Sequence, residues 1–263
     1  MRGPFLSSQP FRYGGVVAQP MTILLPPSEG KAAGGEPATA RGRFDEDLDR
    51  PRAAVIKSLH RAVKDADEAK AKKLFGATGF LLERSIECAK ATGDPAAPTL
   101  PAWQRYTGVV WEHLEPETLA PVQRDCLIIP SGLYGMSSGS DPIVDFRLTM
   151  AASLPAVGTL SKYWRRSLTQ VLMDTVEDGV VFDLLPGEHR SAFDGRALMR
   201  LQNYVSVDFV RRDGHGTAGH AAKAVKGVMA RTLLDAGLDG ARRFKWRGWK
   251  TVVRGNQIVV IAP

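Results

Sequence analysis

The chain contains little cysteine. Its 263 residues include two cysteines, Cys88 and Cys126, and neither belongs to a Cys-x-x-Cys pair. A scaffold held together by disulfides would need more of them, so that class of protein is excluded. Both residues lie in apolar stretches, one helix-like and one strand-like, and we expect them to be buried free thiols of a reducing compartment.

Metal-ligand spacing and long apolar runs are also absent. The five histidines show no His-x-x-x-His or His-x-His spacing, and His215 and His220 alone are close in sequence. We therefore expect no metal site and no cofactor. No apolar run approaches the ~18–20 residues that a membrane span needs, so no membrane partner is expected. Residues 1–20 lack the apolar core of a signal peptide, and we expect a disordered leader before Met21.

Acidic residues are scarce in the last part of the chain. Between Arg211 and Pro263 there are eleven Lys and Arg but three Asp, whereas the whole chain has a net charge of +7. A local positive field attracts polyanions and speeds their arrival. The alternative is a solvated basic surface that aids solubility and has no specific partner.

Apolar periodicity predicts alternating strands and helices. Strands are expected over residues 21–25, 126–130, 144–150, 180–185 and 204–211, with a terminal hairpin from 244–253 and 257–262. Helices are expected over 51–91 in at least two pieces, 101–114, 160–175 and 218–236. This interleaving predicts an α/β (mixed α+β) protein: a single compact domain over 21–263, with a central mixed sheet, surrounding helices and a positively charged cleft.

Polar side chains follow two of the expected strands. Ser28, Glu29 and Lys31 come after the first, in a loop that lacks the glycine spacing of a Walker A sequence. Such a loop could bind a small anionic ligand, and an ordinary exposed turn explains the same residues equally well. Ser131 and Tyr134 belong to a Ser-Gly-Leu-Tyr-Gly sequence without the setting of a hydrolase nucleophile, so we expect a turn that presents their hydroxyl groups.

Further charged residues stand at the ends of expected elements. Arg147, Lys162 and Glu188 each lie beside aromatic or apolar neighbours. Individually such residues form salt bridges at element ends, and together they could converge on one cleft. Lys223, Lys226 and Arg231 lie on a helix rich in small residues, which predicts close packing. Cations on a buried helix need counter-charges or an anionic ligand.

A lysine-rich stretch leads into a glycine-bearing turn between two expected helices. It covers residues 70–83. Such a turn can present backbone N–H groups to a phosphate, as in a helix-hairpin-helix element, although an ordinary helix break fits the same residues.

These motifs, in this order, resemble the bacterial peroxide-stress protein YaaA family. The resemblance rests on the loop with Ser28 to Lys31, the Ser-Gly-Leu-Tyr-Gly sequence and the Arg147 segment. The helix that ends at Arg231 is similar to the family's basic helix, with Lys226 in place of Arg. The Leu-Arg-Pro that commonly follows Ser-Gly-Leu-Tyr-Gly is replaced here by residues 136–140, which places the chain in a divergent branch.

The resemblance implies a cytoplasmic protein that binds DNA through a basic cleft. It also implies protection against peroxide by limiting free iron and oxidative damage. A helix-hairpin-helix element is implied too, and we place it at residues 70–83. DNA-binding or anion-binding side chains would be those of Lys31, Arg147, Lys162, Lys223, Lys226 and Arg231, beside Ser28, Ser131 and Tyr134.

The alternative is an enzyme acting on a phosphorylated or nucleobase-like small molecule. Glu29 and Glu188 would then serve as acid or base, and Lys223 as base or covalent amine. Convergence of the polar residues into a closed pocket favours this alternative, whereas an open basic groove favours DNA. The sequence leaves the oligomeric state open.

Overall fold

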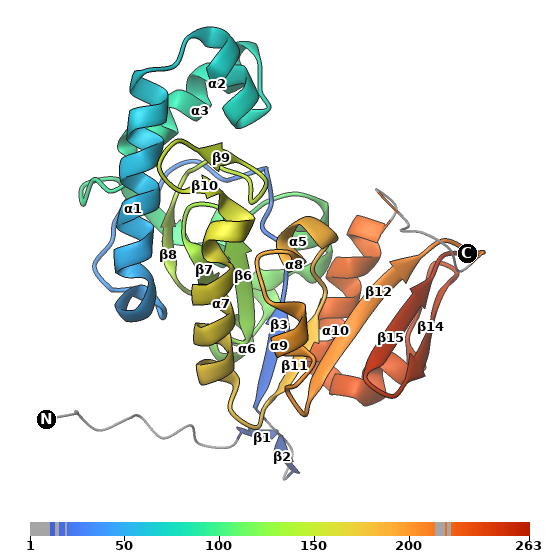
Figure 1. The fold of residues 1–263 in the computed structure, drawn as a ribbon. Coiled ribbons are helices and arrows are strands. Elements are labelled where there is room, and N and C mark those ends of the chain that lie inside the picture. The colour runs from blue at the N-terminus through green and yellow to red at the C-terminus, as the bar shows by residue number, and fades with distance from the viewer. Residues whose placement is uncertain (1–10, 14–15, 19, 214–218, 220–221) are drawn as a thin grey trace, which may run out of the picture.

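The computed structural model describes residues 11–13, 16–18, 20–213, 219 and 222–263, and it shows helices around a large mixed sheet (Figure 1). The strands are β1 Phe11–Tyr13, β2 Val16–Ala18, β3 Met21–Leu24, β4 Glu36–Pro37, β5 Pro98–Pro101, β6 Leu127–Ser131, β7 Gly135–Ser138, β8 Pro142–Val144, β9 Ser153–Leu154, β10 Gly158–Thr159, β11 Val180–Asp183, β12 Tyr204–Val210, β13 Lys245–Trp246, β14 Trp249–Arg254 and β15 Gln257–Ile261. The helices are α1 Asp45–Lys64, α2 Glu68–Phe75, α3 Gly79–Ala91, α4 Ala102–Arg105, α5 Val109–Leu114, η1 Pro116–Thr118, α6 Pro121–Asp125, α7 Leu160–Val176, α8 Gly187–Arg190, α9 Gly195–Leu198 and α10 Ala222–Arg243. The expected mixed α/β class is confirmed.

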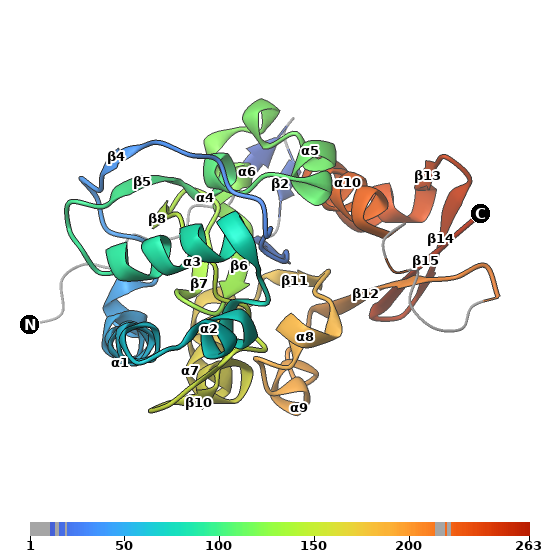
Figure 2. The same ribbon diagram turned by 90° about the horizontal axis from the view of Figure 1, so that it is seen from above.

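The large sheet has the order β13-β14-β15-β12-β11-β3-β6-β7. Its central strands β6, β3, β11, β12 and β15 run parallel, and β7 and β14 pair with their neighbours in antiparallel fashion. Viewed from above, α7 and α9 lie on one side of this sheet, and α6 and α10 lie on the other (Figure 2). Helices on both faces explain why Ile23, Leu24 and Phe182 are fully or almost fully buried.

The Ser-Gly-Leu-Tyr-Gly sequence forms the tight connection between β6 and β7. Gly135 has a φ of +74°, and a Cβ there would lie 2.8 Å from the Trp164 ring. A Cβ on Gly132 would lie 2.6 Å from the carbonyl oxygen of Leu148. The indole N–H of Trp164 donates a 3.0 Å hydrogen bond to the carbonyl of Gly132. Gly135 is therefore needed for α7 to pack against this turn, whereas Gly132 permits the close approach of the backbone of residues 148–149.

Most expected elements are confirmed, but the strand over 144–150 is wrong. Its first residue ends β8, and the following residues have no strand partner. The segment instead crosses the carboxyl edge of the large sheet, where Asp145 pairs with Arg84 of α3 and Arg147 donates to a backbone carbonyl. Alternating apolar residues therefore mark a buried loop here.

Several helix boundaries also differ from expectation. The helix over 101–114 is divided into α4 and α5, with Gly108 at a φ of +95° between them. Pro51 lies inside α1 rather than in its first turn. The sequence predicts that a helix ends just before Gly237. Gly237 does have non-helical backbone angles, but α10 continues beyond it. Residues 218, 220 and 221, placed at the start of that helix, lie outside the described residues, as does His215.

The remaining expectations concern the leader, the cysteines and membranes. Of the expected disordered leader the structure describes Pro20 and the segments Phe11–Tyr13 and Val16–Ala18, which pair as β1 and β2. The other leader residues lie outside the described residues, and the expectation stays a prediction. Cys88 and Cys126 are unpaired and half-buried rather than fully buried. Among the described residues no helix is long and apolar enough to cross a membrane.

Candidate functional site

The chain connections diverge between two neighbouring parallel strands, β3 and β11. From β3 the sheet continues to β6 on one side, and from β11 it continues to β12 on the other. In sheets of this kind ligands bind beyond the carboxyl ends of the strands, at this point of divergence. The loops in that place are residues 25–31 after β3 and residues 184–190 after β11.

One cluster of side chains surrounds Lys31. We call Lys31, Tyr106, Asp145, Phe146 and Arg147 the Lys31 cluster. The ammonium group of Lys31 donates a 2.9 Å hydrogen bond to the carbonyl of Ser28. Its Nζ lies 4.5 Å from the centroid of the Phe146 ring and 5.5 Å from that of Tyr106. Aromatic faces of this kind hold a cation in a largely apolar place.

The segment from Asp145 to Arg147 connects this cluster to its surroundings. Asp145 Oδ2 forms a 2.7 Å ion pair with Arg84 of α3. Arg147 Nη1 donates a 3.0 Å hydrogen bond to the carbonyl of Glu29. The loop after β3, the segment after β8 and helix α3 are thereby joined around the amine of Lys31.

Burial changes the protonation behaviour of the cluster. It lowers the pKa of Lys31 to about 8, and this outweighs the opposing effect of Asp145, while the Arg147 charge lowers the pKa further. Burial raises the pKa of Tyr106, which therefore stays a neutral hydroxyl. At neutral pH the cluster holds a protonated amine that loses its proton in mildly alkaline solution.

Ser131 and Tyr134 lie next to the Lys31 cluster and hold its neighbouring backbone in place through hydrogen bonds. The backbone N–H of Tyr134 donates to Ser131 Oγ at 3.2 Å, and that of Val144 donates to Tyr134 Oη at 2.9 Å. The Tyr134 and Phe146 rings meet edge to face with centroids 5.6 Å apart. Both hydroxyl groups thus accept bonds from the protein's own backbone and position the Lys31 cluster. Ser28 does the same by accepting a 3.1 Å bond from the N–H of Gly30.

A second cluster lies where β11 ends: Asp183 is the last residue of β11, and Tyr204 at the start of the neighbouring strand β12 donates to it. We call Asp183, His189, Arg190, Tyr204 and Lys226 the Lys226 cluster. Lys226 is 8% exposed, donates to the carbonyl of Leu184, and holds its Nζ 4.9 Å from the centroid of the Phe209 ring. Asp183 is fully buried and accepts from Arg190 Nε at 2.7 Å, from the N–H of Leu185 at 2.8 Å and from the Tyr204 hydroxyl.

Two bases of this cluster have lowered pKa values. Burial lowers the pKa of Lys226 to about 8, although Asp183 opposes the shift. Burial, assisted by the charge of Lys226, lowers the pKa of His189 to about 4. A neutral imidazole therefore lies beside a protonated amine at neutral pH.

The predicted acid–base residues lie outside both clusters. Glu29 is exposed, and its backbone carbonyl rather than its carboxylate contacts Arg147. Glu188 is exposed on α8 and accepts a 3.1 Å bond from the N–H of Ala151. Lys223 is exposed near the start of α10.

The basic helix does not present its cations on one surface. Lys226 points into the protein, whereas Arg231 forms a 2.8 Å ion pair with Asp235 and a 2.6 Å hydrogen bond with Thr118. Of the predicted anion-binding residues, Lys31 and Arg147 therefore lie in one cluster. Lys226 lies in the other cluster, and Arg231 lies where α10 contacts η1.

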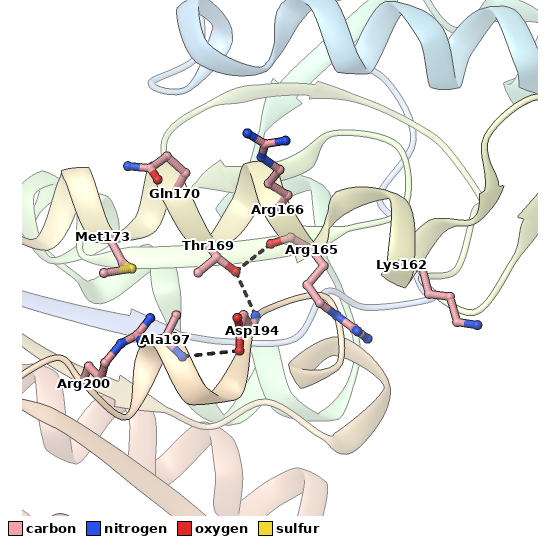
Figure 3. Close-up of a pocket in the computed structure, with 9 residues that line it drawn as sticks. All are labelled: Lys162, Arg165, Arg166, Thr169, Gln170, Met173, Asp194, Ala197 and Arg200. Carbon is pink, nitrogen blue, oxygen red and sulfur yellow. Dashed lines mark hydrogen bonds between the residues drawn. The ribbon is translucent and has the colours of Figure 1, made fainter.

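Lys162 belongs to a third place, an open groove of ≈ 500 Å³ between α7 and α9 (Figure 3). Its walls are Lys162, Arg165, Arg166, Thr169, Gln170, Met173, Asp194, Ala197 and Arg200. The four cations are exposed, and none is ion-paired with another residue that the structure describes. The single carboxylate, that of Asp194, accepts from the backbone N–H groups at the start of α9. We call this feature the α7–α9 groove.

Sequence reasoning missed several residues of these sites. Asp183 had a signal, because it is a charged residue in an otherwise apolar strand. His189 and Arg190 directly follow Glu188, a charged residue that the sequence already singled out. Tyr106 had no signal, since its neighbours come from distant parts of the chain. In the described part of the chain, no group of three or more His, Cys, Asp or Glu side chains is placed to hold a metal ion.

Comparison with known proteins identifies the family. The sequence profile described as peroxide stress protein YaaA matches residues 21–252, which is most of the chain. The chain belongs to the YaaA peroxide stress protein family. The profile spans the Lys31 cluster, the Lys226 cluster and the α7–α9 groove alike.

Individual relatives agree with this assignment. A UPF0246 protein of Streptomyces coelicolor is 33% identical over 223 residues, covering 82% of this chain and 84% of its own. A UPF0246 protein of Corynebacterium glutamicum is 30% identical over 222 residues, covering 81% and 84%. One from Corynebacterium efficiens is 30% identical over 225 residues, covering 82% and 86%. The resemblance inferred from the motifs is confirmed.

Proposed function

We propose that this YaaA family member acts in the response to peroxide stress by binding DNA through its phosphate backbone, with the α7–α9 groove as the main contact. The observation that carries this proposal is the set of four exposed cations around the groove without ion-pair partners among the described residues. Other exposed cations, such as Arg41 and Arg242, are paired with carboxylates. Unpaired cations along a groove suit phosphates and read no base sequence.

In the cell, the bound DNA would be shielded from oxidative damage. The family resemblance adds a limit on free iron, which we include in the proposed role together with a place in the cytoplasm. The chemistry of the groove supports the DNA part of this role alone.

The α2–α3 hairpin is proposed as an accessory DNA contact of the helix-hairpin-helix kind. The two helices are joined by Gly76, Ala77 and Thr78, and Gly76 ends α2 in the left-handed conformation. Its lysines are partly neutralised, because Lys70 pairs with Asp67 and Lys72 with Glu68. We therefore assign the larger share of affinity to the groove.

Fluorescence anisotropy of a labelled DNA duplex tests the proposal. The variant K162Q/R166Q/R200Q removes three groove cations and keeps Arg165, which donates to the carbonyl of Ser191. We expect its affinity at low salt to fall by at least tenfold, since each phosphate contact contributes roughly equally.

The matched control is R41Q/R242Q/R254Q, which removes the same charge outside the groove. It should bind nearly as well as the unmodified protein. Equal losses in the two variants would show that net charge alone governs binding and would remove the groove from the proposal. Absence of duplex binding at low salt would contradict the DNA function itself.

A second candidate is an enzyme acting on a phosphorylated or nucleobase-like small molecule. It is favoured by the two amines, Lys31 and Lys226, whose pKa is lowered to about 8 beside the divergence point of the sheet. Acid–base roles for Glu29, Glu188 and Lys223 remain predictions. Chromatographic detection of product from nucleotides, with K226M as the comparison, tests it; turnover that persists in K226M would exclude Lys226 as the base.

A further inference from the structure

Unpartnered buried polar atoms gather around Lys31. Among the described residues, the buried side-chain atoms without a hydrogen-bond partner are Tyr106 Oη, Trp111 Nε1, Ser137 Oγ, Asp145 Oδ1, Arg147 Nε and His189 Nδ1. Three of these six belong to the Lys31 cluster. Buried polar groups in folded proteins are almost always hydrogen-bonded, because leaving one without a partner is costly. Two of them have polar neighbours, since Tyr106 faces the Ser131 hydroxyl group and Asp145 faces the Cys88 thiol, yet neither Tyr106 Oη nor Asp145 Oδ1 makes a hydrogen bond of normal geometry. This concentration of unpartnered atoms is the observation from which we infer a ligand.

The three atoms differ in what they offer. Arg147 Nε is a donor, Asp145 Oδ1 is an acceptor, and the Tyr106 hydroxyl can act as either. The ammonium group of Lys31 has three N–H donors and donates to the carbonyl of Ser28. A matching ligand therefore has several acceptor oxygens and at least one hydrogen to donate.

The charges favour an anion. Asp145 is already neutralised by Arg84 through Oδ2, whereas Lys31 and Arg147 contact neutral backbone carbonyls. Two positive charges thus remain without a carboxylate of their own within the cluster. The Phe146 ring and the Tyr106 ring restrict the space next to the amine, which favours a compact group.

We propose that the Lys31 cluster binds a small oxyanion that carries its own O–H donor, such as dihydrogen phosphate or a singly protonated phosphate monoester. Lys31 and Arg147 bind the negatively charged oxygens, and Asp145 Oδ1 accepts the O–H of the ligand. Sulfate has the same shape but no hydrogen, so it leaves Asp145 Oδ1 unpartnered and faces a carboxylate. This site is independent of DNA binding, because it shares no residue with the α7–α9 groove.

Calorimetric titration of the full chain at pH 6 with sodium phosphate, and with sodium sulfate at matched ionic strength, tests the proposal. We expect saturable phosphate binding at least tenfold tighter than sulfate binding, the range of one hydrogen bond to a charged group. D145N should abolish this preference, and K31M should weaken both anions. Phosphate binding should also weaken as the pH rises, first because the ligand loses a proton around neutral pH and then, near pH 8, because Lys31 loses its own. The second decrease should be missing in K31M.

The groove variant K162Q/R166Q/R200Q serves as control and should retain phosphate binding, even if it no longer binds DNA. Equal affinity for phosphate and sulfate, or binding that is unchanged in K31M, would overturn the proposal. In case a variant does not fold, amine labelling of the unmodified protein gives a second readout. Phosphate should protect Lys31 from trinitrobenzenesulfonate more than sulfate does, and equal protection would equally contradict the proposal.

Discussion

His189 lies against Lys226 with its Nδ1 buried and without a hydrogen-bond partner. Burial lowers its pKa from the ordinary value of about 6.5 to about 4. Between these two pH values the unfolded chain binds a proton that the folded protein does not. The unfolding free energy therefore falls as the pH decreases through this window.

The replacement H189Q removes this titration and should flatten the acid limb of the stability profile. The expected reduction in slope is at most about 1.4 kcal/mol per pH unit between pH 6 and pH 4.5. Urea unfolding at several pH values measures it. An unchanged slope would show that the imidazole is accessible to protons in the folded state.

Gly135 carries two constraints that alanine cannot meet. Its φ is +74°, and an added Cβ would lie 2.8 Å from the Trp164 ring. We expect G135A to lower the unfolding free energy by about 2–4 kcal/mol, from backbone strain and overpacking together. G195A is the control, since nothing lies within 4 Å of that added Cβ. A similar, small effect of both changes on urea unfolding would contradict this account.

For single residues, the sequence identified several positions of the turn and the site, but it did not identify which side chains contact them. The Ser-Gly-Leu-Tyr-Gly sequence predicts a turn, and the β6–β7 connection is a tight turn in which Gly135 has a positive φ. It cannot predict that Trp164 packs on Gly135, because this contact depends on how α7 crosses the sheet. The same holds for Tyr106, which reaches Lys31 through tertiary packing.

Among the elements, α10 and α5 pack closely at Gly227. A Cβ on Gly227 would lie 2.2 Å from the carbonyl oxygen of Val110. G227A should therefore separate the two helices and lower the unfolding free energy by about 1–3 kcal/mol, although alanine is the better helix former. Thermal unfolding checks the change, and stabilisation would mean that the helices are not in close contact.

Periodicity predicted the elements that are buried on one or two faces. The parallel strands and α7 were found because long apolar runs and helical stripes are strong signals. The segment after β8 was mistaken for a strand, since Phe146, Leu148 and Met150 alternate and are buried as in a strand. Their burial comes from a loop that covers the carboxyl edge of the sheet, and local pattern does not distinguish the two cases.

For the whole molecule, charge counted along the chain did not locate the groove. The cations of the basic C-terminal part do not gather on one surface. Lys226 is buried, and Arg231 and Arg242 are ion-paired. The α7–α9 groove comes instead from the nearly neutral part, where the fold brings the Lys162 and Arg200 regions together. Only the tertiary structure decides which cations lack counter-charges.

The proposed role predicts a phenotype at the scale of the cell. In a strain without this protein, the unmodified chain should restore survival after hydrogen peroxide exposure. The variant K162Q/R166Q/R200Q should not, whereas R41Q/R242Q/R254Q should restore it. Viable counts at matched protein levels measure the difference. Full rescue by the groove variant would show that protection against peroxide does not depend on the groove.

DNA binding through the α7–α9 groove is tested most directly by the salt dependence of duplex binding, compared between the unmodified protein and the groove variant. Each neutralised phosphate contributes about 0.9 to the slope of log affinity against log salt concentration. If Lys162, Arg166 and Arg200 contact phosphates, the variant's slope should be smaller by about 2–3. Equal slopes for the two proteins would show that these side chains do not contact DNA and would contradict the account.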